Sequence, residues 1–395
     1  MRSSNSKILS RNESEDMSTQ KIFSDARPSR RELVRIAFGA ALGGTPLGWS
    51  RSLLAASVTS RPELPGIHLA LDAPVHPTDE DLLFFKQVGV DAVYIRGTKP
   101  EDQTLDGLRA LKKRYSDAGL TISDIDYHAV TGNLGDIVLN RSGRDKAIEA
   151  YKMWIHTASA AGFHSLEPVM FNATARVESD DADVRGSRDR GFDMKSSELT
   201  GSRASGKGPV SALLLGREYG ADEIWENYTY FVRQIAPVAE EAGVWIGFAT
   251  DDPPLPSLFG VANIFSSFES YKKALKIANS PNVGVSMGCG EWLEGGVAMG
   301  LDIPGAIRYF AARKQLFEVS FRNASAALPS FHETYVDDGY YDMLKIMKTL
   351  VDIKYEGVVP LDHFVKMVGG RRMYDAFGIG YMRAMLQCAQ RGYHV

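Results

Sequence analysis

Carboxylate, thiol and guanidinium groups recur in the second half of the chain, each directly after a short apolar run. Asp251 and Asp252 follow one such run, and the two prolines after them end any helix and fix the turn. Cys289 and Glu291 follow the next run, between glycines that permit close approach of the backbone. Groups of these types bind divalent cations and transfer protons.

Three further groups follow the last two apolar runs: Arg322 after the first, and Asp362 and His363 after the second. Carboxylates such as Asp362 are the ligands that Mg²⁺ and Mn²⁺ prefer. The planar guanidinium of Arg322 matches a substrate carboxylate, with an ion pair to Asp251 or Glu291 as the alternative. The imidazole of His363 titrates in the range useful for general acid or base catalysis. Together these groups predict a metal-assisted site that binds a carboxylic acid.

The apolar runs alternate with amphipathic stretches, which predicts a parallel sheet covered on both faces by helices. Eight strands and eight helices favour an α/β single-domain (β/α)8 TIM barrel, with an open doubly wound sheet as the alternative. The sequence contains neither of the two glycine-rich nucleotide-binding fingerprints, which argues against the open sheet. Strands are expected at residues 66–71, 92–96, 122–128, 165–171, 244–248, 283–287, 316–321 and 357–361, and helices at 79–88, 104–118, 146–161, 221–242, 267–278, 303–312, 342–351 and 371–390.

Barrels of this type carry their reactive groups where strands end and βα loops begin. His128 ends the third expected strand and Asn172 follows the fourth, so both are candidates to bind substrate hydroxyls. Residues 178–208 contain many charged residues and almost no apolar ones, which predicts a long βα loop insertion after strand 4 that forms no core. This loop is either a mobile lid over an anionic substrate or a solvated segment.

Residues 1–60 have the features of a leader rather than of a folded domain. Arg30 and Arg31 precede an apolar, glycine-rich stretch at 36–49, which is too short to cross a bilayer because a spanning helix needs about 20 apolar residues. This order resembles a twin-arginine export signal, with cleavage near 55–57. A basic, disordered arm is the alternative. We therefore expect a periplasmic protein whose catalytic barrel spans 61–395 and has no membrane segment.

The composition is that of an ordinary globular protein, with 395 residues of which 44% are hydrophobic and 24% charged. The formal net charge of -4 provides no field that would attract nucleic acid. Two cysteines, Cys289 and Cys388, cannot build a disulfide scaffold or a four-cysteine zinc site. A small molecule is the expected ligand, and a second copy of the chain is the usual partner of such barrels.

Several motifs, in order, resemble the mannonate dehydratase family. They span residues 246–256, 279–282, 320–323, 331–333, 338–343 and 361–363, so that the match covers roughly residues 60–395. The resemblance implies a single-domain barrel that dehydrates D-mannonate to 2-keto-3-deoxy-D-gluconate with a divalent metal, usually manganese. It also implies that Asp362 binds this metal and that His332 and Glu333 lie near the substrate. His363 and Asp252 are the candidate catalytic residues.

The chain departs from the family at three ligand positions. Ala249 and Ser320 occupy the positions of two metal-binding histidines, and Gly288 occupies that of a metal-binding cysteine. Cys289 is displaced by one residue and so points to the opposite face of a strand unless the backbone bulges. Two outcomes stay open: a site that has abandoned metal, or a rebuilt Mg or Mn site. The groups available to the rebuilt site are Asp251, Glu291, Asp362, Cys289 and His363.

Three functions are consistent with these residues. The first is a hydro-lyase that removes water from a sugar acid such as D-mannonate to give a 2-keto-3-deoxy acid. The second is a sugar or sugar-acid isomerase or epimerase on the same barrel, which yields a product without loss of water. The third is an exported, non-catalytic protein that binds a sugar acid.

Overall fold

The computed structural model describes residues 65–127, 134–174, 179–195, 198–200, 205–207, 213, 215–363 and 365–392, so the expected leader lies outside the described residues. Parallel strands form two sheets. The first has the order β15-β1-β2-β3, with the bounds Gly357–Pro360, Ile67–Ala73, Ala92–Ile95 and Thr121–Ile125. The second has the order β12-β11-β8, with the bounds Leu316–Ser320, Val283–Gly288 and Ile246–Phe248.

Single parallel bridges join the two sheets into a closed barrel. Leu166 pairs with the last residue of β3, and Val169 pairs with Phe248 of β8, so this segment takes the place of the fourth strand. On the other side, Phe321 pairs with Leu361 and connects β12 to β15. The closed (β/α)8 barrel is confirmed, and the open sheet is not formed. The fourth strand differs from the prediction because it is present only as these bridges.

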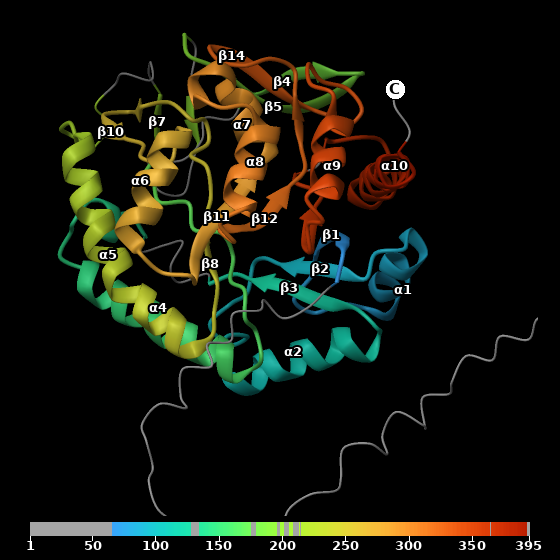
Figure 1. The fold of residues 1–395 in the computed structure, drawn as a ribbon, viewed down its shortest axis with the longest axis horizontal. Helices are drawn as coiled ribbons and strands as arrows, with labels where there is room; N and C mark the ends of the chain where they lie inside the picture. Colours follow the sequence, from blue (N-terminus) through green and yellow to red (C-terminus); the bar gives the residue numbers. More distant parts are fainter. Residues whose placement is uncertain are drawn as a thin grey trace, which may run out of the picture. The chain divides into compact units, whose positions relative to one another are not determined.

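Helices surround the strands (Figure 1). They begin where the sequence supplies a cap: the side chain of Thr78 accepts a hydrogen bond from the backbone of Asp81, whose carboxylate accepts one in return. Among the described residues, no helix is both long enough and apolar enough to cross a membrane. The helices are α1 (Asp79–Val88), α2 (Leu105–Asp117), α4 (Arg144–Ala160), α5 (Ala221–Ala242), α6 (Phe268–Ala278), α7 (Cys289–Gly295), α8 (Ile303–Ala311), α9 (Met343–Asp352) and α10 (Arg371–Gln390).

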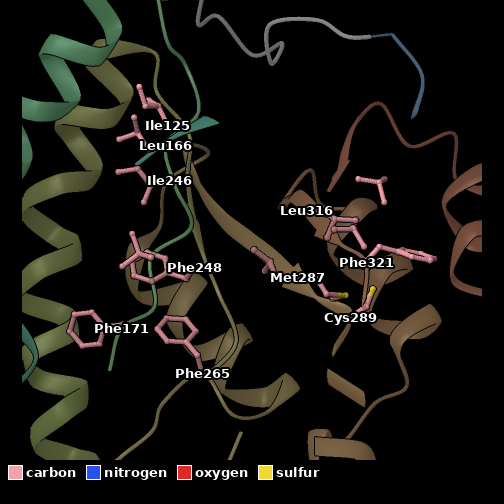
Figure 2. Close-up of a cluster of buried hydrophobic side chains, with 14 of the residues drawn as sticks. Ile125, Leu166, Phe171, Ile246, Phe248, Phe265, Met287, Cys289, Leu316 and Phe321 are labelled. Atoms are coloured by element: carbon pink, nitrogen blue, oxygen red, sulfur yellow. The ribbon is translucent and has the colours of Figure 1, made fainter. Parts of the chain in front are cut away.

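The main hydrophobic core lies between the strands and the helices. Alternate strand residues such as Leu69 and Leu71 face outward and pack in this core, whereas the inward residues Ala70 and Ala92 are small and belong to a separate cluster. Figure 2 shows part of the outer layer, in which the rings of Phe248 and Phe265 stack with centroids 5.0 Å apart. Aromatic side chains of this size dominate the energy of such a layer.

The insertion after the fourth strand is partly folded, which corrects the prediction of an unpaired loop without core. Strands β4 (Ser179–Val184) and β5 (Ser187–Asp193) form an antiparallel hairpin, and β5 pairs with β14 (Ser330–Thr334). Phe192 is buried with its ring centroid 5.6 Å from that of Phe331. The few apolar residues of the insertion suffice because β14 supplies the other half of this small core. These strands lie together at the top of Figure 1, beside α7.

Candidate active site

Arg322 lies at the centre of a group of carboxylates at the C-terminal ends of the barrel strands. It follows β12, and its side chain is only 1% exposed. Its Nη1 atom lies 2.5 Å from Glu294 Oε1 and 2.9 Å from Glu333 Oε1. Three more carboxylates face its other nitrogens: Asp362 at 3.3 Å, Glu291 at 3.2 Å and Asp252 at 3.8 Å.

This arrangement keeps Arg322 charged, with hydrogen bonds at Nη1 and Nε and only ion pairs at Nη2. Burial alone would lower the pKa of Arg322, but Glu294 and Glu333 outweigh burial and raise the pKa well above its ordinary value. A guanidinium whose three nitrogens all face carboxylates presents no open edge to a substrate. The structure therefore does not fit the predicted role of Arg322 as the ligand of a substrate carboxylate. The alternative, an ion pair with Glu291, is present.

His363 lies at the solvent side of this cluster. Its Nδ1 atom is 2.7 Å from Glu333 Oε1, which assigns the Nδ1–H as the donor to that carboxylate, and its Nε2 atom is 3.5 Å from Asp362 Oδ1. Its side chain is 32% exposed, against 2% for Glu333. His363 also adopts a left-handed backbone conformation with φ of 56°, which is uncommon for a residue other than glycine. It is thus the member of the cluster best placed to meet a bound substrate.

Arg190 reaches the same cluster from the insertion, where the sequence predicted it only as one of several charges of a lid over an anionic substrate. Its Nη2 atom lies 2.8 Å from Glu333 Oε1, and it also contacts the ring of His363. Its side chain is 22% exposed, so it faces solvent as Arg322 does not. The available signal was the spacing of Arg190 and Phe192, which places both on one face of a strand.

Two adjacent predicted residues, His332 and Glu333, lie on β14 and point to opposite faces of it. Glu333 is buried and contacts Arg322, Arg190 and His363. His332 is half-buried, and within the described part of the chain no hydrogen bond or ion pair links its ring to the cluster. Burial lowers the pKa of His332. Of the two, only Glu333 joins the candidate site.

Glu291 places its carboxylate over Gly288, the last residue of β11. A Cβ atom at position 288 would overlap Glu291 Oε2. Glu291 Oε1 pairs with Arg322, whereas Oε2 is buried and accepts no hydrogen bond from the described residues. Burial raises the pKa of Glu291, and the attraction of Arg322 offsets this only in part. A buried carboxylate with a raised pKa and one unbonded oxygen has the properties of a general base.

Asp251 lies below this cluster and is held by the protein itself. Its Oδ1 atom accepts a hydrogen bond from Asn172 Nδ2 at 3.2 Å, and its Oδ2 atom accepts one from the backbone N–H of Phe265 at 2.8 Å. Burial raises the pKa of Asp251 to about 7. The structure thus pairs two predicted site residues, Asn172 and Asp251, with each other. The third predicted hydroxyl ligand, His128, lies outside the described residues.

The Asp251→Asn variant is expected to lose a pH dependence of stability. Because the pKa rises from 3.8 to about 7 on folding, the folded state binds the proton more tightly. The contribution of Asp251 is therefore complete below pH 3.8 and is lost as the pH rises through 7, by up to about 4 kcal/mol. Urea unfolding between pH 4 and 8 should show a flatter profile for the variant. The exposed Asp106→Asn variant should keep the wild-type profile, and two parallel profiles for wild type and Asp251→Asn would contradict this assignment.

Cys289 begins α7 and points away from the site. It is fully buried in the outer core, near Met287 and Phe321 in Figure 2. Gly288 stays in register with Ser320 of β12, so no bulge turns the thiol inward at this point. Burial, with a further contribution from Glu291, raises the pKa of Cys289 well above its ordinary value. The thiol thus lies on the side away from the carboxylate cluster, and the register shift between β11 and β12 lies earlier, between Val285 and Ser286.

The thiol of Cys289 is therefore expected to be inert. In the native protein, an aromatic disulfide reagent should modify at most Cys388, which is partly exposed, because the thiolate is the reactive species and Cys289 is buried as a thiol. In denaturant, both cysteines should react. Rapid labelling of Cys289 in the native state, measured by peptide mass spectrometry, would show that this core opens.

The side chains at the expected metal-ligand positions do not fit the metal site of the mannonate dehydratase family, which the sequence resembles. Ala249 offers no donor where the family has an imidazole, and Ser320 offers only a hydroxyl, 3.5 Å from Asp362 Oδ2. The thiol of Cys289 lies in the core. Among the described histidine, cysteine, aspartate and glutamate side chains, no group of three could hold a metal ion. Of the four predicted ligands, Glu291 and Asp362 both lie against Arg322. Asp251 is held by Asn172 and Cys289 lies in the core, so the four do not form one site.

A second polar layer lies inside the barrel, and the sequence analysis missed it. Arg96, at the end of β2, forms ion pairs with Asp124 at 2.6 Å and with Glu167 at 3.3 Å. Across the barrel, Ser286 Oγ donates a hydrogen bond to Glu318 at 3.1 Å. The signal was the presence of charged residues inside apolar strand segments of the first half of the chain. Arg96, Asp124 and Glu167 lie in the first half of the chain, whereas most of the predicted site residues follow strands of the second half.

Comparisons with known proteins agree with this fold and with the motifs. Residues 212–393 match the family model described as D-mannonate dehydratase (UxuA). The chain is 27% identical over 341 residues to mannonate dehydratase 2 of Halalkalibacterium halodurans, which covers 78% of this chain and 93% of that protein. It is 32% identical over 167 residues to a mannonate dehydratase of Thermotoga neapolitana, 42% of this chain and 45% of that protein.

Solved structures show the same barrel. The crystal structure of mannonate dehydratase from Streptococcus suis superposes with a TM-score of 0.68 at 23% identity, and covers 82% of this chain and 95% of that one. An L-ribulose 3-epimerase superposes with a TM-score of 0.53 at 13% identity, over 82% and 96% of the two chains. The chain therefore matches the mannonate dehydratase family model over residues 212–393, and over most of its length it is similar in sequence and in fold to mannonate dehydratases.

Proposed function

We propose that the chain is a hydro-lyase that removes water from a sugar acid such as D-mannonate and gives a 2-keto-3-deoxy acid. The observation that carries this proposal is the half-exposed His363 imidazole, held between Glu333 and Asp362 at the mouth of a barrel similar to those of this family. Enzyme sites on such barrels lie at this end. The reaction needs one group that removes the C2 proton and one that protonates the departing C3 hydroxyl.

Glu291 and His363 are the residues suited to these two steps. Glu291 is the carboxylate suited to accept the proton from C2, because burial raises its pKa and Oε2 accepts no hydrogen bond from the described residues. Oε2 is buried over Gly288, so this step requires the carboxylate to turn toward the substrate. The protonated His363 imidazole donates its Nε2 proton to the C3 hydroxyl, which leaves as water, while Glu333 retains the Nδ1–H hydrogen bond. The C2–H and C3–O bonds break, a C2–C3 double bond forms, and the resulting enol rearranges to the 2-keto acid.

Arg190 is the cation suited to the substrate carboxylate. It is partly exposed and contacts both Glu333 and the His363 ring, so an acid held by it lies next to the catalytic imidazole. Because its guanidinium is partly exposed, Arg190 can attract an anion even though its Nε and Nη2 atoms both bond Glu333. Arg322 and Asp252 then act behind this layer: Arg322 holds the carboxylates in place, and Asp252 faces its Nη2 atom.

A sugar epimerase is the second candidate, and the charge balance of the site favours it. Arg322, Arg190 and His363 face five carboxylates within the cluster, an excess of acceptors that suits the hydroxyls of an uncharged sugar. An epimerase also needs an acid and a base on two sides of one carbon. The two candidates differ in their products, because only the hydro-lyase releases water.

The test is product analysis by NMR after the purified chain is incubated with a panel of aldonic acids and ketoses. The hydro-lyase predicts loss of the C3 hydroxyl from D-mannonate or a stereoisomer, and a methylene signal at C3 of the product. An isomeric product from a ketose would support the epimerase instead. If a sugar acid binds but no product forms, the chain is a non-catalytic protein that binds a sugar acid. A parallel reaction with chelator is expected to proceed at the same rate, because the donors do not fit the family's metal.

We also propose that the protein is exported to the periplasm by the twin-arginine route. The paired Arg30 and Arg31 before the apolar stretch at 36–49 support this proposal. Replacing both arginines by lysine should retain the full-length protein in the cytoplasm. Fractionation followed by mass spectrometry of the N-terminus tests this, and equal amounts of processed protein from both genes would contradict it.

A further inference from the structure

The interior of the barrel contains a charged layer that the proposed reaction does not use. Arg96 enters from β2, Asp124 from β3 and Glu167 from the segment that replaces the fourth strand. Side chains that point into a barrel normally fill it as a packed core. Here Arg96 and Glu167 are 27% and 28% exposed, whereas the inward residues Ala92 of β2 and Ala70 of the neighbouring β1 are fully buried. Solvent therefore reaches this layer, and the barrel is closed below it.

Arg96 is fixed on two of its three nitrogens. Nη1 lies 2.6 Å from Asp124 Oδ1 and donates a hydrogen bond to the backbone carbonyl of Ile95 at 2.9 Å. Nε lies 3.3 Å from Glu167 Oε1. No hydrogen bond or ion pair from the described residues engages Nη2. A guanidinium held in this way presents the two N–H groups of Nη2 in a fixed direction, with little loss of side-chain freedom when they bind a ligand.

Small residues and one tyrosine connect this layer with the catalytic cluster. Gly247 and Ser286 on the neighbouring strands β8 and β11 keep side chains short, since a Cβ on Gly247 would lie 3.0 Å from Ser286 Cβ. The guanidinium carbon of Arg96 lies 4.8 Å from the ring centroid of Tyr94. Tyr94 Oη in turn donates a hydrogen bond to the carbonyl of Leu361, the residue before Asp362. Tyr94 thus joins Arg96 to the segment that carries Asp362 and His363.

We propose that Arg96 and Glu167 form a subsite for a pair of adjacent hydroxyls on the open-chain tail of the substrate. The Nη2 group donates to one hydroxyl oxygen, and the Glu167 carboxylate accepts from the neighbouring hydroxyl. The layer holds one guanidinium against Asp124, Glu167 and Glu318, so it repels the carboxylate end of a sugar acid and accepts its hydroxyl end. The carboxylate then lies toward Arg190. This inference rests on the proposed function for the identity of the acid, but not for the hydroxyl tail.

Calorimetric binding to the full barrel tests the subsite, with D-mannonate, the three-carbon acid D-glycerate and uncharged D-mannitol as probes. Arg96→Lys keeps the positive charge beside Asp124 and removes Nη2, and Glu167→Gln keeps the size of the side chain. Each variant should bind D-mannonate about tenfold or more weakly, as expected for a lost charge-assisted hydrogen bond, and glycerate unchanged. Arg114→Lys, at an exposed arginine of α2, is the matched control and should bind as the wild type does. Melting temperatures should confirm that all variants are folded.

The outcomes separate this inference from the proposed function. Weakened binding of D-mannonate or D-mannitol by Arg96→Lys supports the subsite even if no dehydration product is found. Equal affinities of wild type and both variants for each probe overturn it, as does a wild type that binds neither D-mannonate nor D-mannitol. Dehydration of D-mannonate with an unchanged KM in both variants also overturns it and leaves the hydro-lyase standing.

Discussion

The Arg322→Met variant is expected to lose about 3–5 kcal/mol of stability, a large share of the 5–15 kcal/mol typical of a folded protein. Methionine fills a similar volume but supplies no charge, so the variant loses the cation closest to Glu294 and one of the cations that face Glu333. Replacing one partner of a buried ion pair costs more than the pair contributes, because the remaining charge is uncompensated. Urea unfolding at neutral pH measures this loss as a lower midpoint at an unchanged slope.

A second substitution identifies the cause. Glu294 is fully buried and is the closest partner of Arg322, so Glu294→Gln should restore part of the stability lost in Arg322→Met. Arg114→Met removes an exposed ion pair on α2 and should cost less than about 1 kcal/mol. If the urea midpoint of Arg322→Met equals that of the wild type, the assignment is wrong. The buried carboxylates would then take up protons in the variant and would not need the guanidinium.

The His363→Asn variant is expected to turn over about 10²- to 10⁴-fold more slowly than the wild type, the usual contribution of a positioned acid or base. Asparagine can still donate to Glu333, so the cluster should stay assembled, but it has no proton to give to a leaving hydroxyl. We expect kcat to fall while the dissociation constant for the sugar acid and the melting temperature change little. Steady-state kinetics and calorimetry on one preparation separate these quantities.

His156→Asn, at an exposed position on α4, is the matched control and should keep wild-type kinetics. An unchanged kcat in His363→Asn would remove this imidazole from the chemistry. A fall in kcat together with a fall in stability would instead point to a structural role for the Glu333 hydrogen bond.

The barrel could be predicted from the sequence because its signal is periodic and local. Short apolar strands alternate with helices such as α1. The capping motif of this helix, formed by Thr78 and Asp81, lies within four consecutive residues and can be recognised from them alone. The same regularity placed Glu291, Arg322 and Asp362 at one end of the barrel, since parallel strands end together. The observed ion pairs confirm that these three residues meet.

The rest depends on contacts between segments distant in sequence. Arg190 enters the site only because β5 pairs with β14. The sequence of residues 178–208 does not predict which strand β5 pairs with. The register of β14 decides that Glu333 and not His332 faces the cluster. The number of carboxylates around Arg322 decides that it binds protein and not substrate. Each of these features depends on strand register or on contacts between distant segments, and neither can be predicted from a single sequence.

Gly288 links the altered donor set to the ion pairs of Arg322. The carboxylate of Glu291 fills the space that a side chain at position 288 would need, so a cysteine there requires this carboxylate to move. Glu291 is also a partner of Arg322, so the move changes the charges around that guanidinium. Substitutions at positions 288 and 291 are therefore expected to be coupled, because a ligand restored at position 288 alone meets a site already arranged around another side chain.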